Sequence, residues 1–434
     1  MRVLIGIAVA AIAVNTAQAQ LRVPVVPLPA LPLQKLTQTA GQTEADTLQQ
    51  LSDVRHQLMA SLIKTNPRII AADPHGNPIV RGELLAYSPS APAIEAAQAR
   101  GFTIAREQTA ADLDIRLVVL QPPASMNIVK ALRALREADP GGTYDFNHIY
   151  TGVGVLSATR SVGLLGEAPA PQEVGANRSN QPLPRVGLID TGVDATHPVF
   201  RNALIQSWGC SGRVLPSAHG TAVASLLVGQ SSRFHGVLDK AELFAADVYC
   251  NAPTGGAVDA LAAAFAWLAQ QRVAVINVSL VGPDNAALGQ IVRALTSRGY
   301  VLVAAVGNDG PAAPPLYPAS YPHVVGVTAV DAHRRVLIEA ARGNQVMFAA
   351  RGADMSAADL GGKYSSIRGT SFAAPIVAAL LAQSVTAPDL SSSNAAIESL
   401  AHSAVDLGPK GRDLTYGFGL VDADYSPDIV LPGR

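Results

Sequence analysis

Three short motifs carry an acid, a base and a nucleophile. Asp190 ends an apolar run in VGLIDTGVD, His219 opens the small-residue segment AHGTAVAS, and Ser371 lies in GTSFAAP. Pro375 fits the first turn of a helix, so Ser371 is expected at a helix start, close to unpaired N–H donors. A Ser hydroxyl needs a base before it attacks a carbonyl, and a His with a pKa of about 6.5 is such a base at neutral pH.

The order Asp, His, Ser along the chain is that of subtilisin. From Arg185 to Ala423 the sequence resembles the subtilisin-like serine proteases, the subtilases (peptidase S8). Two further segments agree: AAVGNDG, which contains Asn308 and precedes YPASYP, and the closing turn LTYGFG. The resemblance implies a serine endopeptidase that acts on polypeptide substrates.

The same resemblance assigns the catalytic roles. Ser371 would attack the peptide carbonyl, His219 would carry the proton, and Asp190 would hold the imidazole in one tautomer. Asn308 and the Ser371 backbone N–H would stabilise the oxyanion. These four residues argue against the alternative, a catalytically inactive subtilase scaffold that binds peptides.

Other assignments of these residues are conceivable. Asp194 or Asp247 could orient His219, although Asp190 holds the motif position, and Asn308 could be a simple turn residue. Aspartic proteases also use Asp-Thr-Gly loops, but they need two of them. The sequence contains no second Asp-Thr-Gly or Asp-Ser-Gly, so that reading is excluded.

The resemblance implies that two extended segments pair with the substrate as strands. One is the stretch Asn251 to Gly256. The other consists of Ser279, Leu280, Val281 and Gly282. Val281 stands where many members have Gly and is expected to narrow the primary specificity pocket, whereas Asp309 at the pocket rim would accept a basic side chain.

The chain between these motifs predicts an α/β fold. From Arg185 onward, short β-branched runs alternate with helical patterns, which is typical of a parallel sheet buried on both faces. Sites in such sheets gather where strands end. We therefore expect a subtilisin-like, doubly wound, mostly parallel catalytic domain over residues 185–425, with a short tail at 426–434.

Residues 83–150 predict a smaller α+β unit. Their order of elements is β-α-β-β-α-β, that of a ferredoxin-like sandwich. The unit occupies the position of a subtilase propeptide, which implies an intramolecular inhibitor and a self-processing precursor. Residues 20–82 are Pro-rich and then helical, with no assigned role, and residues 151–184 are expected to be a linker, with the self-cleavage between Tyr144 and Pro184.

The first residues predict export. Arg2, an apolar run from Val3 to Val14 and the sequence Ala17-Gln18-Ala19 form a signal peptide over residues 1–19, so the product is periplasmic or secreted. The chain has 2 cysteines, Cys210 and Cys250, and an oxidising compartment favours a disulfide between them over two buried free thiols.

Composition excludes other classes of function. The chain has a net charge of −1, from Lys+Arg 32 and Asp+Glu 33. It therefore lacks the excess of positive charge that a general nucleic-acid-binding protein needs. Beyond the signal peptide no apolar stretch is long enough for a transmembrane segment in the mature chain. The chemistry requires no cofactor. Structural calcium is frequent in the family, but no ligands can be assigned and no metal site is predicted.

Overall fold

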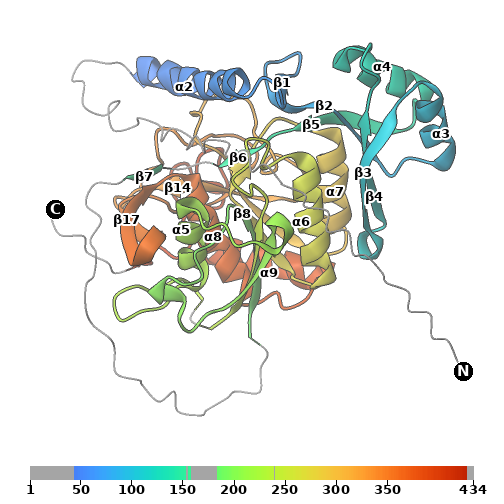
Figure 1. The fold of residues 1–434 in the computed structure, drawn as a ribbon. Helices are drawn as coiled ribbons and strands as arrows, with labels where there is room; N and C mark the ends of the chain where they lie inside the picture. Colours follow the sequence, from blue (N-terminus) through green and yellow to red (C-terminus); the bar gives the residue numbers. More distant parts are fainter. Residues whose placement is uncertain (1–43, 153–154, 158–182, 239, 428–434) are drawn as a thin grey trace, which may run out of the picture.

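The computed structural model describes residues 44–152, 155–157, 183–238 and 240–427. A long helix, α2 (Glu44–Thr65), precedes an N-terminal unit of residues 70–148, and a larger C-terminal unit follows from residue 183 (Figure 1). No described helix is both long and apolar enough to cross a bilayer. The expected signal peptide and the end of the tail lie outside the described residues.

A seven-stranded parallel sheet forms the centre of the C-terminal unit, in the order β15-β14-β13-β11-β8-β10-β9. Its strands are β8 (Arg185–Asp190), β9 (Leu204–Gly209), β10 (Glu242–Asp247), β11 (Val275–Val278), β13 (Val301–Ala305), β14 (Val325–Val330) and β15 (Val346–Arg351). The order reverses on either side of β8, the strand that ends in Asp190. Such a reversal is where α/β sheets place their ligands.

Helices cover both faces of this sheet, as the apolar runs predict. On one face the core joins the sheet to α5 (Ala218–Val228) and α8 (Thr370–Ala382). On the other face it joins the sheet to α6 (Val258–Gln270) and α7 (Ala286–Thr296). A last helix, α9 (Leu390–Ser403), packs against α8. The doubly wound α/β class is thereby confirmed.

The N-terminal unit is a four-stranded antiparallel sheet in the order β3-β4-β2-β5, with the short β1 beside β2. Its elements are β1 (Ile70–Ala72), β2 (Pro78–Tyr87), α3 (Ala91–Ala99), β3 (Thr103–Ala110), β4 (Ile115–Gln121), α4 (Ile128–Ala138) and β5 (Thr143–His148). The order of elements is the expected one, although β2 begins at Pro78 rather than Glu83.

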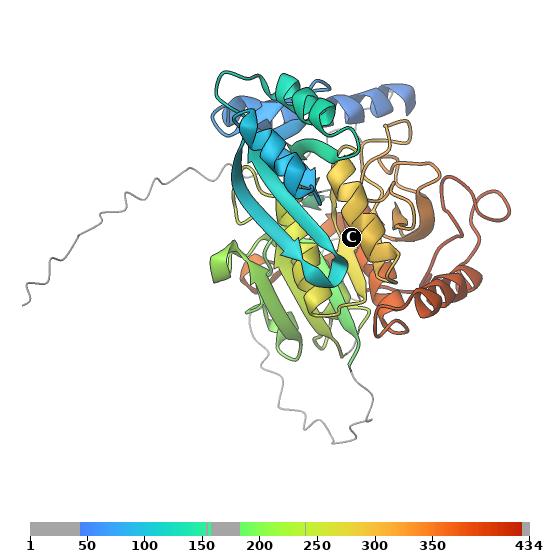
Figure 2. The same ribbon diagram turned by 90° about the vertical axis from the view of Figure 1, so that its right-hand side faces the viewer.

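The two faces of this smaller sheet have different partners. One packs against α3 and α4 through Ile94 and Leu132. The other packs against the C-terminal unit, where Leu85, Leu117 and Val119 share a core with α6 and α7. Figure 2 shows the β3–β4 hairpin in front of those two yellow helices. Both units therefore depend on apolar surface that they bury against each other.

Part of the expected linker forms strands instead. β6 (Thr151–Gly152) pairs antiparallel with β12 (Leu280–Val281), and β7 (Val155–Ser157) pairs antiparallel with β17 (Lys363–Arg368). On its other edge, β17 pairs with β16 (Met355–Asp359). The composition of residues 151–157 did not predict strands. These residues pair with unpaired backbone N–H and C=O groups at the edges of strands from distant parts of the chain. Residues 158–182 lie outside the described part.

Candidate active site

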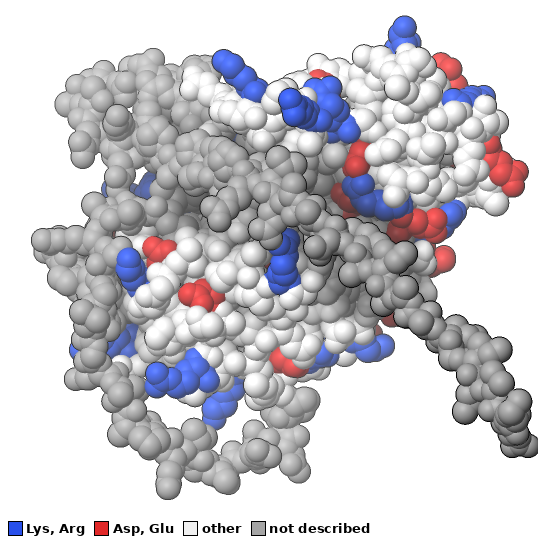
Figure 3. Space-filling view, viewed as in Figure 1, with Lys and Arg blue, Asp and Glu red and all other residues white. Residues whose placement is uncertain are grey.

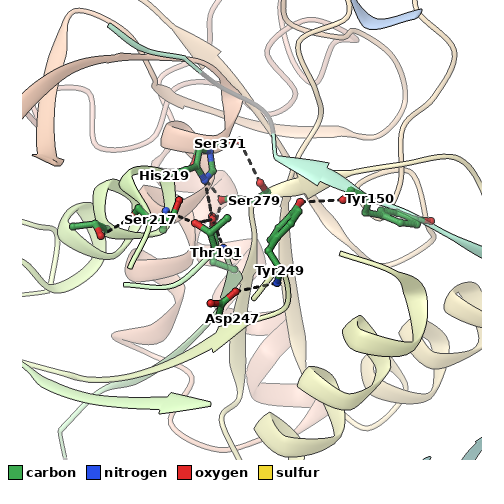
Figure 4. A network of polar contacts seen from close by, with 12 residues as sticks. Tyr150, Thr191, Ser217, His219, Asp247, Tyr249, Ser279 and Ser371 are labelled. Carbon is green, nitrogen blue, oxygen red and sulfur yellow. Dashed lines mark hydrogen bonds and ion pairs between the residues drawn. The ribbon is translucent and has the colours of Figure 1, made fainter. Parts of the chain in front are cut away.

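Asp190 and His219 meet at the carboxyl end of the central strand. Asp190 is the last residue of β8 and is 2% exposed, and His219 is in the first turn of α5. The Nδ1 atom of His219 lies 2.8 Å from Oδ1 and 3.0 Å from Oδ2 of the Asp190 carboxylate (Figure 4). The carboxylate therefore fixes the orientation of the imidazole and directs Nε2 to the opposite side of the ring.

Thr191 braces this pair and was not identified from the sequence. Its hydroxyl donates to the Asp190 carboxylate at 3.1 Å and accepts the Gly220 N–H at 2.9 Å. A Cβ on Gly220 would lie 2.3 Å from the Thr191 carbonyl oxygen, so only glycine permits this approach. The Thr after Asp190 and the Gly after His219, both part of the quoted motifs, are the signals that could have predicted the contact.

Ser371 lies beside His219. It is the second residue of α8, is fully buried, and places its Oγ 3.5 Å from the Ser279 carbonyl oxygen. The ring of the next residue, Phe372, lies 5.4 Å from the His219 ring, and Figure 4 shows Ser371 and His219 in one network of polar contacts. The structure thus brings together the three residues that the motifs selected, at the ends of one strand and two helices.

Asn308 follows β13 and is fixed on the start of α8. It is 5% exposed, and its Oδ1 accepts the Thr370 N–H at 3.1 Å. The preceding Gly307 donates its N–H to the Thr370 hydroxyl at 3.2 Å. The residue next to Ser371 thus holds Oδ1, and the amide Nδ2 is the donor group that this side chain has left.

A family model described as the subtilase family matches residues 184–419, which is more than half of the chain. The chain belongs to the subtilase family. The C-terminal unit is therefore that of a subtilisin-like serine protease.

Individual relatives of this subtilase agree. It is 33% identical to Subtilisin BL of Lederbergia lenta over 264 residues, which is 59% of this chain and 94% of that protein. It is 31% identical to the minor extracellular protease Epr of Bacillus subtilis (strain 168) over 209 residues, 47% of this chain but 32% of that protein. Fervidolysin of Fervidobacterium pennivorans has a TM-score of 0.63 at 20% identity, over 82% of this chain and 62% of its own, and shows a shared fold.

The two alternative carboxylates of this subtilase are bound elsewhere. Asp194 accepts hydrogen bonds from the N–H and the hydroxyl of Thr196. Burial raises the pKa of the Asp194 carboxyl, but these hydrogen bonds outweigh it and hold the pKa below the usual value. Asp247 accepts the N–H groups of Tyr249 and Cys250, but burial raises the pKa of its carboxyl. The carboxylate against His219 Nδ1 belongs to Asp190.

Cys210 and Cys250 form a disulfide, with Cα atoms 5.1 Å apart. The bond joins the end of β9 to the loop after β10, two strands that pair next to β8. It closes a loop across a sequence separation of 40 residues, which raises the free energy of unfolding by about 4 kcal/mol in the loop-entropy model. The disulfide thus stabilises the edge of the sheet near Asp190.

The expected substrate-binding segments of this subtilase hold its own residues 149–152. Thr151 pairs with Val281 and Gly152 with Leu280, antiparallel to the segment of Ser279 to Gly282. On the other side, the Gly256 carbonyl accepts the Tyr150 N–H at 2.9 Å. Backbone pairing on both sides is how a protease binds an extended peptide. The side chain of Val281 is fully buried in the core. That it narrows the primary specificity pocket stays a prediction.

Tyr150 fills a pocket between these two segments. Its side chain is fully buried, its hydroxyl donates to the Pro283 carbonyl, and its own carbonyl accepts the Tyr249 hydroxyl at 3.0 Å. A Cβ on Gly282 would lie 2.7 Å from the Tyr150 ring, so the ring packs directly on glycine backbone. The sequence did not predict this contact of Tyr150, because the pocket is formed by distant segments of the chain.

Proposed function

We propose that this subtilase is an exported serine endopeptidase that uses an Asp190–His219–Ser371 triad and is made as a self-processing precursor. The observation that carries the proposal is the contact of His219 Nδ1 with the buried Asp190 carboxylate at 2.8 Å, next to the start of the helix that bears Ser371. A buried carboxylate on one ring nitrogen is the arrangement that makes the other nitrogen a base for a Ser hydroxyl.

The reaction begins with attack of Ser371 Oγ on the peptide carbonyl while His219 Nε2 takes the hydroxyl proton. Asp190 stabilises the resulting imidazolium, and the Asn308 amide and the Ser371 N–H donate to the oxyanion. His219 then passes the proton to the leaving amine, which departs and leaves an acyl-enzyme. Water, deprotonated by the same imidazole, releases the acid and restores Ser371. The four residues supply every proton and charge interaction that these steps need.

The course of the uncut chain supports self-processing. β6 pairs with β12, which follows Ser279 at the Ser371 hydroxyl, and β7 pairs with β17, the strand that leads into α8. The bond to be cut then lies between Gly152 and Val155, at the start of the expected linker. The proposal narrows the expected cleavage region, Tyr144 to Pro184, to these residues.

Polar contacts across the interface support the role of the N-terminal unit as an intramolecular inhibitor. Arg106 binds Glu83 of its own unit at 2.6 Å and Asp259 of α6 at 2.7 Å. The buried Asn147 amide donates to both carboxylates at 2.8 Å. These contacts orient the N-terminal unit so that residues 149–152 enter the cleft. Export, the remaining part of the proposal, agrees with the Cys210–Cys250 disulfide.

The proposal is tested by a fluorophosphonate probe, which reacts with an activated Ser and not with an ordinary hydroxyl. We expect the processed protein to be labelled on one site and the Ser371→Ala protein to remain unlabelled. Peptide mapping locates the modified residue. A processed, folded protein that takes up no probe and cleaves no peptide would instead be the inactive peptide-binding scaffold.

The Tyr150 pocket gives a prediction about substrate preference. In peptides of the form Tyr-Thr-Gly-Val, which follow the chain from Tyr150, replacing Tyr by Ala should lower kcat/KM about 30-fold, as for loss of a buried aromatic anchor worth about 2 kcal/mol. Phe should lose only about fivefold, the value of one hydrogen bond to the Pro283 carbonyl. Steady-state kinetics measure both ratios. Equal rates for Tyr and Ala peptides would contradict the substrate-like binding of residues 150–152.

A further inference from the structure

The side chain of Tyr249 has no part in the chemistry described so far, although it borders the occupied cleft. It follows the end of β10 by two residues and is 9% exposed. Figure 4 shows its ring between Asp247, the last residue of β10, and the backbone of Tyr150. The phenol therefore lies against the segment that occupies the place of a substrate.

The Tyr249 hydroxyl binds two backbone groups of this segment. It donates to the Tyr150 carbonyl at 3.0 Å. Its oxygen accepts a hydrogen bond from the Gly152 N–H. In an extended strand, the C=O of one residue and the N–H of the second residue after it lie on the same side, so one phenol can serve both.

The hydroxyl completes the hydrogen bonding along one side of the bound segment, whose other side pairs with β12. On the Tyr249 side, the Gly256 carbonyl accepts the Tyr150 N–H at 2.9 Å, and the phenol binds the groups that come next along the segment. The pairing expected from Asn251 to Gly256 is thus provided in part by a side chain that precedes that stretch.

The turn after β10 fixes the backbone that carries the phenol. The Oδ1 atom of Asp247 accepts the N–H groups of Tyr249 and Cys250, each at 2.9 Å. Cys250 and Asn251 have left-handed φ angles of 50° and 53°, and the disulfide ties this turn to the end of β9. A side chain held in this way loses little further freedom when it binds a ligand.

The Tyr249 hydroxyl keeps its proton and so remains a donor. Burial raises the pKa of the phenol well above its usual value, and the negative charges of Asp190 and Asp247 act in the same direction. Arg55 and the Gly152 N–H lower this pKa, but by less. At neutral pH the phenol therefore offers a proton to a carbonyl and an oxygen atom to an N–H.

Charge offers no general means of substrate selection on the face in view in Figure 3. On the described part of that face, Lys and Arg are dispersed among Asp and Glu. Hydrogen bonds to a peptide backbone do not depend on the side chains, but they do distinguish proline, which has no N–H. The Tyr249 oxygen is therefore sensitive to one property of a bound sequence, the presence of an N–H at a given residue.

We propose that the Tyr249 hydroxyl binds the backbone of the substrate and rejects proline at the position that Gly152 occupies in the precursor. The inference rests on the proposed function, because a substrate takes this place only after the N-terminal unit has left. Proline there leaves the buried phenol oxygen without its donor. Other residues retain the N–H, and their side chains have room, because a Cβ on Gly152 would have no heavy atom within 4 Å.

The selection against proline is tested on the processed enzyme with peptides that follow the chain from Tyr150 to Val155 and carry Ala or Pro in place of Gly152. The Ala peptide should be preferred about tenfold or more in kcat/KM. Tyr249→Phe removes only the hydroxyl, so this Ala/Pro ratio should fall about fivefold, the value of one hydrogen bond. The same ratio in Tyr249→Phe would overturn the proposal.

Tyr300→Phe is the matched control for the loss of a buried hydroxyl. The Tyr300 hydroxyl donates to the Ala269 carbonyl at 3.2 Å, in the core behind the sheet. This variant should leave the Ala/Pro ratio unchanged. A fall of the ratio in both variants would mean that the effect comes from a general loss of packing and would contradict the contact of Tyr249 with the substrate.

The contact with the carbonyl is tested with two acetylated peptides that begin at the positions of Thr151 and Gly152. Both contain the N–H of Gly152, but only the acetyl group of the longer peptide places a carbonyl where Tyr150 has its own. Tyr249→Phe should therefore lower kcat/KM about fivefold more for the longer peptide than for the shorter one. An equal loss for both peptides would remove the carbonyl from the proposal.

The precursor offers the same comparison within the chain. Gly152→Pro should process itself about tenfold or more slowly than Gly152→Ala, and Tyr249→Phe should reduce this difference. Proline favours an extended conformation at Thr151, the residue before it, which agrees with the strand β6, so the substitution does not oppose the fold there. Equal rates for the Pro and Ala variants would contradict the role of the N–H.

A last measurement needs no cleavage and so separates this inference from the proposed function. In the uncut Ser371→Ala chain, hydrogen exchange of the Gly152 N–H should accelerate several-fold in Tyr249→Phe and not in Tyr300→Phe. A protein that takes up no fluorophosphonate but shows this acceleration would retain the Tyr249 contact and lose the protease assignment. A labelled, active protease whose Gly152 exchange and Ala/Pro ratio ignore Tyr249→Phe would retain the assignment and lose the contact.

Discussion

Ser371→Ala is expected to yield a full-length, folded and uncut chain. The substitution removes one oxygen whose contact, with the Ser279 carbonyl, is long at 3.5 Å. The Ser279 hydroxyl donates to the backbone carbonyl of Ser371, which alanine retains. The free energy of unfolding should therefore change by no more than about 1 kcal/mol. Catalysis should fall by about 10⁶ in kcat, a magnitude borrowed from the same loss in subtilisin itself.

The measurement is the mass of the product and its circular dichroism. Expressed in a protease-deficient host, the Ser371→Ala protein should carry residues 44–157 attached to the C-terminal unit, while the unsubstituted protein separates between Gly152 and Val155. His219→Ala is the matched control, since it removes the base and leaves the nucleophile. Cleavage of the Ser371→Ala chain at this position would show that another protease processes it, and would contradict self-processing.

Asn308→Ala should lower kcat about 10²- to 10³-fold with little change in KM, the magnitude known for loss of such a donor in subtilisin. The reason is that the amide meets the oxyanion only as charge develops, so its loss is felt in the transition state and not in substrate binding. The Oδ1 atom of Asn308 also accepts the Thr370 N–H, so alanine removes a second contact.

Asn308→Asp separates the two contacts. A carboxylate still accepts the Thr370 N–H but donates nothing to the oxyanion, so kcat should fall at least as far as in Asn308→Ala. Thermal unfolding should report the Thr370 contact alone, with a lower Tm for Asn308→Ala than for Asn308→Asp. A loss expressed through KM, or full activity of Asn308→Asp, would make Asn308 a structural residue of the turn.

The sequence was sufficient for the parts of the site that are local. Asp190, His219 and Ser371 stand in motifs whose small neighbours, such as Gly220, are needed for the close contacts that the structure contains. The alternation of β-branched runs and helices likewise predicted the parallel sheet, because a strand buried on both faces has a continuous apolar sequence.

What the sequence could not provide depends on partners far along the chain. Thr151 and Gly152 have the composition of a linker and become a strand only against the edge of β12. Arg55 is one polar residue of an amphipathic helix, and its pairing with Asp309 spans most of the chain. Ion pairs and strand pairings of this kind produce no periodic pattern in the sequence. They can be predicted only once the fold is known.

In the precursor that we propose, the strand pairings of β6 and β7 make inhibition depend on one covalent bond. While β6 and β7 are joined, the N-terminal unit is tethered at a high effective concentration, in the millimolar range for a short connection. After the cut, its retention is an ordinary bimolecular equilibrium set by the interface and the total protein concentration. For the exported enzyme that we propose, dilution after the cut would then act as a signal for activation, without any change in the contacts themselves.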